Sequence, residues 1–144
     1  LGDLAARTRA QGIELSIVLL DLGDEVIPKA IPAQDRLHAL LAEIGVKRLM
    51  AFGDRGQGWA TAMDKPMLCV FKPYDGRPAT VGNGVMVGIA VDSRANVDRI
   101  HAKALELGGT DEGPPGLRAE GGDGFYAAYF RDLDGNKLDV FFYG

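Results

Sequence analysis

The chain closes on the stretch Phe125-Tyr-Ala-Ala-Tyr-Phe-Arg-Asp-Leu-Asp-Gly-Asn-Lys-Leu-Asp-Val-Phe-Phe-Tyr-Gly144, and this stretch decides the fold. Two runs rich in aromatic residues flank the polar segment Asp132 to Asn136. Asp and Asn tolerate tight turns and Gly135 can adopt a positive φ, so the pattern predicts a strand, a short turn and a second strand. Within the second strand, Asp139 is a carboxylate among apolar and aromatic residues.

The residues before this hairpin predict a strand, a helix and a further strand. Val85 to Val91 alternates bulky and small residues, which is typical of a strand with two different faces. Ser93 is a good N-cap, and a stripe at helical spacing runs from Val97 to Leu107 before Gly108-Gly109 ends the helix. Thr110 to Arg118 predicts a strand interrupted by a Gly-Pro-Pro-Gly segment.

The first half of the chain repeats this order of elements. It predicts a strand at Ile13 to Leu22, a helix at Ala33 to Ile44, and strands at Val46 to Phe52, Gln57 to Met63 and Met67 to Lys72. We therefore expect one domain, residues 1–144, built from two modules that share the element order. Module one spans about 13–72, a linker spans 73–83, module two spans about 84–144, and residues 1–12 form an N-terminal arm.

Composition narrows the class of protein. The chain has 144 residues, 47% of them hydrophobic, which is enough for a packed interior. Its net charge is −4 and no basic cluster is present, so we expect no nucleic-acid partner. The longest apolar run, Leu15 to Leu20, is too short to span a bilayer, so we expect no membrane partner. Cys69 is the only cysteine, and with no signal peptide in the sequence we expect a cytoplasmic protein.

Three segments together resemble a known superfamily. Leu41 to Leu49, Asn83 to Val91 and the closing hairpin resemble the glyoxalase, bleomycin-resistance and extradiol-dioxygenase proteins, also called the vicinal oxygen chelate superfamily. The resemblance implies an α+β fold of two βαβββ modules with pseudo-two-fold symmetry, whose mixed sheets curve around a cleft. Metal-dependent members take one ligand, usually His, Glu or Gln, from each of four strands. The matching positions in this chain are Cys69, Met86 and Asp139, with a first-strand position near Ile17.

These side chains suit a catalytic divalent ion poorly. Mg²⁺ and Mn²⁺ prefer oxygen ligands, and Zn²⁺, Ni²⁺ and Fe²⁺ sites use imidazole, carboxylate and thiolate. Met86 is a weak ligand for all of them, and Ile17 is not a ligand. His38 and His101 lie in the expected helices, where we expect surface or helix-flank residues. We therefore expect a degenerate metal site at Cys69, Met86 and Asp139, no bound metal and no cofactor.

The alternation of strand residues predicts which side chains face a cleft. Val85, Val87 and Ile89 should pack on the helix, and Met86 and Gly88 should face the other way. A buried, unpaired carboxylate is costly, so Asp139 should be solvated in the cleft, paired or coordinated; the alternative is a partly exposed Asp at a sheet edge. The expected cleft residues are Trp59, Met67, Cys69, Phe71, Met86, Tyr129, Asp139, Phe141 and Tyr143. Trp59 is equally compatible with the core.

Motifs for other kinds of catalysis are missing. The sequence has no Ser-centred nucleophile elbow and no phosphate-binding glycine loop between a strand and a helix. Gly53 to Gly58 is rich in glycine but precedes a strand, so it predicts a hairpin loop. Cys69 has no identifiable base beside it in the sequence pattern, which favours a buried structural cysteine over a nucleophile.

Three functional hypotheses follow. The first is a metal-free binder of a small molecule, resembling the drug-sequestering branch of the superfamily, with Asp139 as the polar anchor of an apolar cleft. The second is a lyase, isomerase or dioxygenase of the lactoylglutathione-lyase kind that uses a divalent metal, with a missing ligand supplied from elsewhere, for example Glu120. The third is a rearranged, inactive family member. Two small sheets leave their edges exposed, and the resemblance to a superfamily whose members usually dimerise points the same way. We therefore expect a homodimer, either side by side or module-exchanged.

Overall fold

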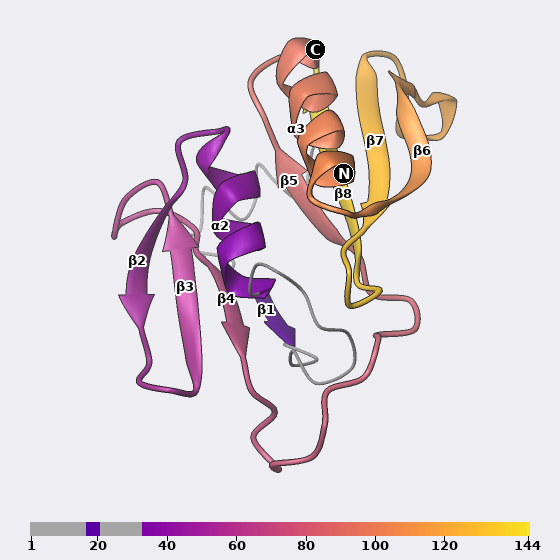
Figure 1. The fold of residues 1–144 in the computed structure, drawn as a ribbon. Helices are drawn as coiled ribbons and strands as arrows, with labels where there is room; N and C mark the ends of the chain where they lie inside the picture. Colours follow the sequence, from indigo (N-terminus) through magenta and orange to yellow (C-terminus); the bar gives the residue numbers. More distant parts are fainter. Residues whose placement is uncertain (1–16, 21–32) are drawn as a thin grey trace.

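Two four-stranded sheets, each with one helix, make up the described structure (Figure 1). The computed structural model describes residues 17–20 and 33–144, so the expected arm at 1–12 and the connection at 23–32 lie outside the described residues. The first module contains β1 (Ile17–Leu20), α2 (Ala33–Ala42), β2 (Lys47–Ala51), β3 (Gly56–Ala60) and β4 (Leu68–Phe71). The second contains β5 (Val87–Ala90), α3 (Arg94–Glu106), β6 (Thr110–Leu117), a 3-10 turn (Ala119–Gly121), β7 (Phe125–Arg131) and β8 (Lys137–Tyr143).

The two sheets have the same topology. Their strand orders are β1-β4-β3-β2 and β5-β8-β7-β6. In each sheet the first strand pairs in parallel with the last, and the remaining pairs are antiparallel. The strand that precedes the helix therefore returns beside the end of its own module, and both sheets are mixed. This arrangement confirms the expected α+β fold of two βαβββ modules.

Helix α3 starts and packs as its sequence predicts. The hydroxyl of Ser93 accepts a hydrogen bond from the backbone N–H of Asn96 at 3.3 Å, which caps the first turn. Val97, Ile100 and Ala104 are buried on the face that meets the second sheet. Burial of this apolar stripe, rather than helix propensity, supplies most of the stability of a helix of this length.

The helices also join the two modules. In Figure 1, α2 and α3 lie side by side in front of the sheets, and they are in contact. Leu40 and Leu41 of α2 belong to the same buried cluster as Val97 and Ile100 of α3. The guanidinium of Arg99 donates to the backbone carbonyl of Glu43 and pairs with its carboxylate at 3.5 Å. One hydrophobic core therefore runs across both modules.

The face assignment in β5 is confirmed for the strand itself and wrong just before it. Val87 is buried and Ile89 packs against the core, whereas Gly88 is exposed on the other face. Val85 is exposed instead of packing on the helix, because the strand starts only at Val87. Gly84 has a φ of 87°, a turn conformation that redirects the chain before pairing begins.

β3 and β6 also differ from the prediction. β3 ends at Ala60 rather than at Met63. β6 continues through the Gly-Pro-Pro-Gly segment instead of being broken by it, at the cost of register shifts between Asp111 and Gly113 and between Gly113 and Gly116. β6 is an edge strand, where proline removes no essential ladder hydrogen bond.

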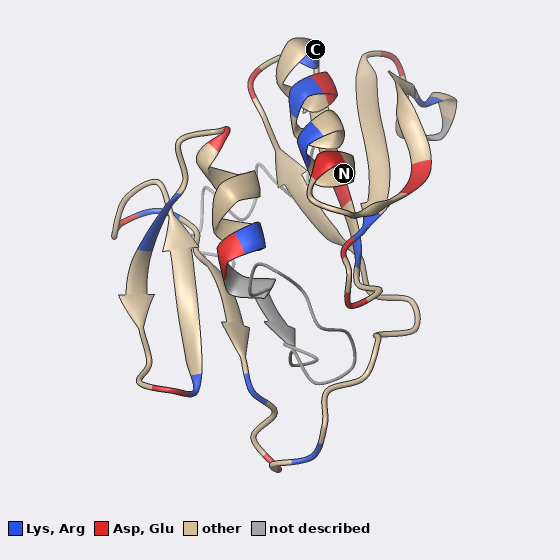
Figure 2. Ribbon diagram, in the orientation of Figure 1, with Lys and Arg blue, Asp and Glu red and all other residues tan. Residues whose placement is uncertain are grey.

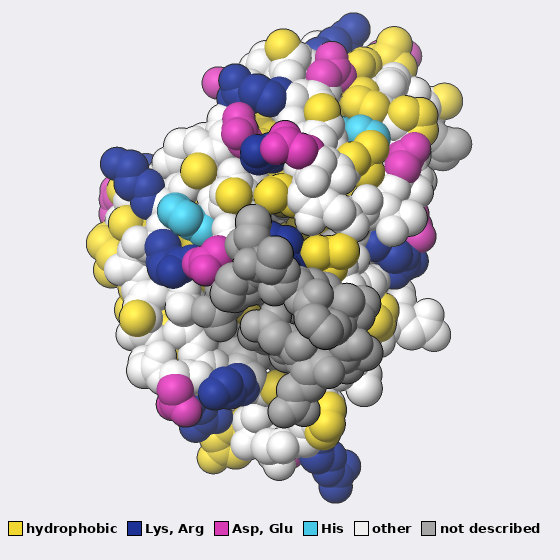
Figure 3. Space-filling view, in the orientation of Figure 1, with side chains coloured by type: hydrophobic (Ala, Val, Ile, Leu, Met, Phe, Trp, Pro, Cys, Tyr) yellow, Lys and Arg dark blue, Asp and Glu magenta, His cyan; other side chains and the backbone are white. Residues whose placement is uncertain are grey.

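Charges of both signs are distributed over the molecule. Acidic and basic residues alternate along α3 and recur in the connections of both modules (Figure 2). The face shown in Figure 3 mixes positive, negative and hydrophobic side chains without a large patch of one sign. Within the described residues, neither α2 nor α3 has the length and apolarity that a membrane-crossing helix requires.

Candidate functional site

Asp139 lies in the middle of the second sheet. β8 runs between β5 and β7, and the register places Asp139 opposite Gly88 on one side and Tyr129 on the other. Only 5% of the residue is exposed. The alternative of a partly exposed Asp at a sheet edge is therefore wrong, because β8 is an interior strand.

The carboxylate of Asp139 occupies space that a side chain at position 88 would need. A Cβ atom added to Gly88 would lie 3.0 Å from Oδ1 of Asp139 and 3.2 Å from Cε1 of Phe141. Contacts of that length are tighter than ordinary van der Waals packing, so glycine at 88 is what allows Asp139 and Phe141 to lie across the parallel strand.

Burial changes the acidity of Asp139. Desolvation raises the pKa of its carboxyl to about 6, opposed by a hydrogen bond with its own backbone amide and by the charge of Lys137. Among the described residues, no cation lies within ion-pairing distance of this carboxylate. A carboxyl of this kind accepts strong hydrogen bonds when ionised and can donate one when protonated.

Aromatic side chains lie on the same face of the sheet as the carboxylate. The rings of Phe125 and Phe141 lie with their centroids 5.5 Å apart. Tyr129 is half-buried, and the charged groups of Arg118 and Lys137 lie over its ring at 5.2 and 5.5 Å from the centroid. Met86 and Tyr143 mark the exposed ends of this face, at 47% and 63% exposure. We call Met86, Gly88, Tyr129, Asp139 and Phe141 the Asp139 face.

The expected site residues of module one lie around Gly58. A Cβ atom added to Gly58 would come within 2.5 Å of Sδ of Met67 and 3.3 Å of Sγ of Cys69. Phe71, further along β4, packs on Phe52 with ring centroids 4.8 Å apart. Burial raises the pKa of the Cys69 thiol, which keeps it protonated and supports a structural role.

Trp59 does not lie with the other expected cleft residues of either module. It pairs with Leu68 and is 1% exposed in the core that includes Leu41 and Val70. The guanidinium of Arg48 lies 5.6 Å from its ring centroid. Its placement in the cleft is therefore wrong, because Trp59 points to the side of the sheet that packs on α2.

The first-strand position was expected near Ile17. The backbone register pairs its neighbour, Val18, with Cys69. Neither residue type is a metal ligand. Among the described residues, no group of three or more His, Cys, Asp or Glu residues is close enough to hold a metal ion.

Sequence reasoning missed a charged network next to the Asp139 face. Glu112 accepts from Nε of Arg131 at 2.5 Å and lies 3.2 Å from Nζ of Lys137. These hydrogen bonds, first that of Arg131 and then that of Lys137, lower the pKa of the Glu112 carboxyl. Nη1 of Arg131 donates to the carbonyl of Gly135 at 2.7 Å. Only the bulge between Asp111 and Gly113 brings Glu112 over these cations, and sequence spacing does not predict it.

The interaction of His101 was also missed. His101 is buried at 6% exposure, and its Nε2 lies 3.0 Å from Oδ1 of Asp111. The expectation of a surface residue is therefore wrong for His101. Its spacing of four residues after Val97 and three before Ala104 is a signal for the buried face of the helix.

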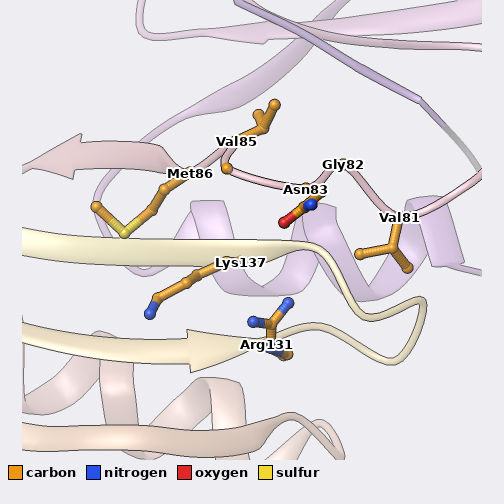
Figure 4. Close-up of a pocket in the computed structure, with 8 residues that line it drawn as sticks. Val81, Gly82, Asn83, Val85, Met86, Arg131 and Lys137 are labelled. Carbon is orange, nitrogen blue, oxygen red and sulfur yellow. The ribbon is translucent and has the colours of Figure 1, made fainter.

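A pocket of about 350 Å³ shares Met86 with the Asp139 face. Figure 4 shows the side chains that line it. The connection before β5 forms one wall and the β7–β8 hairpin forms the other. Its lining residues are Val81, Gly82, Asn83, Gly84, Val85, Met86, Arg131 and Lys137. Met86 belongs to both the pocket and the Asp139 face, and Lys137 of the pocket lies two residues before Asp139 on β8, so the two regions adjoin.

Comparison with solved structures shows which proteins this chain is similar to. The structure of a glyoxalase/bleomycin resistance protein from Albidiferax ferrireducens T118 is similar, with 29% identity, a TM-score of 0.70, and coverage of 89% of this chain and 97% of that one. A putative glyoxalase from Bacillus halodurans is 18% identical with a TM-score of 0.66, covering 94% and 98% of the two chains. No family model and no curated protein matches the sequence.

A third similar structure carries a metal. It is a mutant of the fosfomycin resistance protein FosX from Listeria monocytogenes, complexed with Mn(II) and 1S,2S-dihydroxypropylphosphonic acid. It is 15% identical, with a TM-score of 0.56 and coverage of 88% of this chain and 86% of that one. The resemblance of the closing hairpin to the vicinal oxygen chelate superfamily is confirmed by the Albidiferax ferrireducens structure, and the two less similar structures show the same fold. The described residues at the matching positions, Cys69, Met86 and Asp139, do not fit a hard divalent ion, because only one of them offers an oxygen.

Proposed function

We propose that this glyoxalase/bleomycin-resistance-like protein binds a small organic molecule on the Asp139 face without a catalytic metal. The observation that carries the proposal is the buried carboxylate of Asp139 on a face that also carries aromatic side chains, Met86 and Gly88. Small-molecule sites combine apolar walls with a few polar groups that fix orientation. A group that donates a hydrogen bond to Asp139 would recover much of the free energy that its desolvation costs.

The metal-dependent lyase, isomerase or dioxygenase remains the alternative. Its support is the Mn(II) complex of the FosX neighbour. Against it stands the donor set of this chain, in which the thiol of Cys69 and the thioether of Met86 replace oxygen and nitrogen ligands.

The test uses 4-fluorobenzyl alcohol, a neutral aromatic probe with one hydrogen-bond donor. Titration at pH 8, followed by fluorine NMR and by amide shifts, should perturb Gly88, Tyr129, Asp139 and Phe141. Asp139→Asn should weaken binding, because an amide oxygen is a poorer acceptor than a carboxylate. Asp64→Asn, on an exposed loop, is the matched control and should bind as the parent protein does. Shifts confined to other parts of the molecule, or equal binding by Asp139→Asn, would contradict the proposal.

We also propose that the protein is a cytoplasmic homodimer. Strands β2 and β6 end their sheets and leave ladder groups unpaired within the described part of the chain. Such edges are commonly covered by a partner.

A further inference from the structure

The pocket beside the Asp139 face has a chemistry of its own. Two of its lining side chains, Arg131 and Lys137, are cationic, and among its described lining residues none is acidic. Both cations are only about a third exposed, at 35% and 34% of their side-chain surface. Partial desolvation strengthens their attraction for an anion compared with fully exposed cations.

The other walls suit the body of an organic molecule. Val81, Val85 and Met86 supply apolar surface, and Asn83 supplies an amide that can donate or accept a hydrogen bond. A volume of about 350 Å³ is at the lower end of the range for ligand pockets. The volume and the lining therefore fit a small molecule that carries an anionic group, and they do not fit a large ligand.

Glu112 is the ion-pair partner of both cations. It pairs with Nε of Arg131 and with Nζ of Lys137, and Nη1 of Arg131 is directed to the carbonyl of Gly135. Glu112, Arg131 and Lys137 together carry a net charge of +1, and the carboxyl of Asp139, two residues from Lys137, also interacts with the Lys137 charge. Lys137 carries three donor hydrogens, and its contacts among the described residues are the Glu112 carboxylate and the Tyr129 ring.

Lys137 and Asp139 are two residues apart on one strand and therefore share a face. Their Cα atoms are separated by about 7 Å in an extended strand. A small aromatic acid with a donor group at its far end spans such a distance.

We propose that Arg131 and Lys137 form an anion subsite, and that the ligand is a small organic acid with an apolar body and a hydrogen-bond donor for Asp139. This inference rests on the proposed function, since it names the chemical class of the ligand at the same face. Glu112 competes with the anionic group of the ligand for these two cations, and this competition weakens the anion subsite without abolishing it.

The experiment compares two probes that differ in one group, 4-fluorobenzoate and 4-fluorobenzyl alcohol, by fluorine NMR titration at pH 8. The benzoate should bind about five-fold more tightly than the alcohol, and the preference should shrink as salt is added. Lys137→Met should remove the preference and Lys137→Arg should keep it. Lys72→Met, whose exposed side chain lies near Asp54, is the control and should change nothing.

The decisive variant is Glu112→Gln. It removes the competing charge while keeping the size of the side chain. The affinity of Glu112→Gln for benzoate should therefore exceed that of the parent protein by a factor of about three or more. A purely structural role for Glu112 predicts the opposite sign, because breaking its ion pairs would loosen the pocket. Equal affinity for the two probes, or weaker benzoate binding by Glu112→Gln, would overturn the anion subsite.

The two probes keep this inference separate from the proposed function. Alcohol binding that depends on Asp139, with no preference for the benzoate, would leave the proposed function standing and refute the anion subsite. Benzoate binding that depends on Lys137, together with alcohol binding that does not depend on Asp139, would support the subsite and refute the role of the Asp139 face.

Discussion

The substitution Asp139→Asn tests the central residue through its effect on stability. The carboxyl has an ordinary pKa of 3.8, and burial raises it to about 6 in the folded protein. At about 1.4 kcal/mol per pH unit, this difference corresponds to about 3 kcal/mol. A raised pKa in the folded state means that folding disfavours the ionised form. Asp139 therefore destabilises the fold by this amount above pH 6, and the cost fades as the pH falls toward 3.8.

Urea unfolding of the parent protein and of Asp139→Asn at several pH values between 4 and 8 measures this effect. The variant should be more stable than the parent at pH 8 by up to about 3 kcal/mol, and the difference should shrink by most of that amount at pH 4. Subtracting one curve from the other cancels the titration of all other groups. Asp64→Asn, on the exposed loop after β3, should show a small difference at every pH.

Two results would refute the reasoning. A difference between the parent and Asp139→Asn that does not change with pH would mean that burial does not perturb the carboxyl. Marked destabilisation by Asp139→Asn at pH 8 would mean that the ionised carboxylate has a stabilising partner, such as Lys137.

Three further predictions concern metal, backbone packing and assembly. The purified protein should contain no stoichiometric divalent metal by elemental analysis. A chelator should leave its melting temperature unchanged, because only a bound metal would stabilise the folded state. An ion coordinated by Asp139 would revive the enzyme hypothesis. Gly109→Ala should lower the free energy of unfolding by about 2 kcal/mol or more, since its Cβ would lie 2.8 Å from the carbonyl oxygens of both Ala104 and Arg131. The matched Gly116→Ala, with contacts of 3.7 Å or longer, should cost much less in the same urea titration. Light scattering at micromolar concentration should give the mass of a dimer, and a monomer mass would count against the assembly proposed from the sheet edges.

The sequence alone was sufficient for features that depend on neighbouring residues. The Asp132 to Asn136 turn, the cap at Ser93 and the opposite faces of Val87 and Gly88 were all predicted correctly. Each follows from a local rule: which residues tolerate a turn, which side chain satisfies the first amides of a helix, and which way alternate residues point. The same rules predicted the repeated order of elements in both halves of the chain, and the resemblance of three segments to the superfamily implied the βαβββ fold.

Tertiary structure decided the features that depend on residues far apart in the chain. Alternation says that Gly58 and Trp59 face opposite sides, but only the pairing with Leu68 shows that Trp59 meets α2. The raised pKa of Asp139 depends on β8 lying between β5 and β7. Neighbouring strands on both sides of β8 exclude water from the carboxyl group. Glu112 reaches Arg131 only through a bulge in a different strand. Burial and charge pairing are properties of the packed molecule, and local propensities along the chain do not contain them.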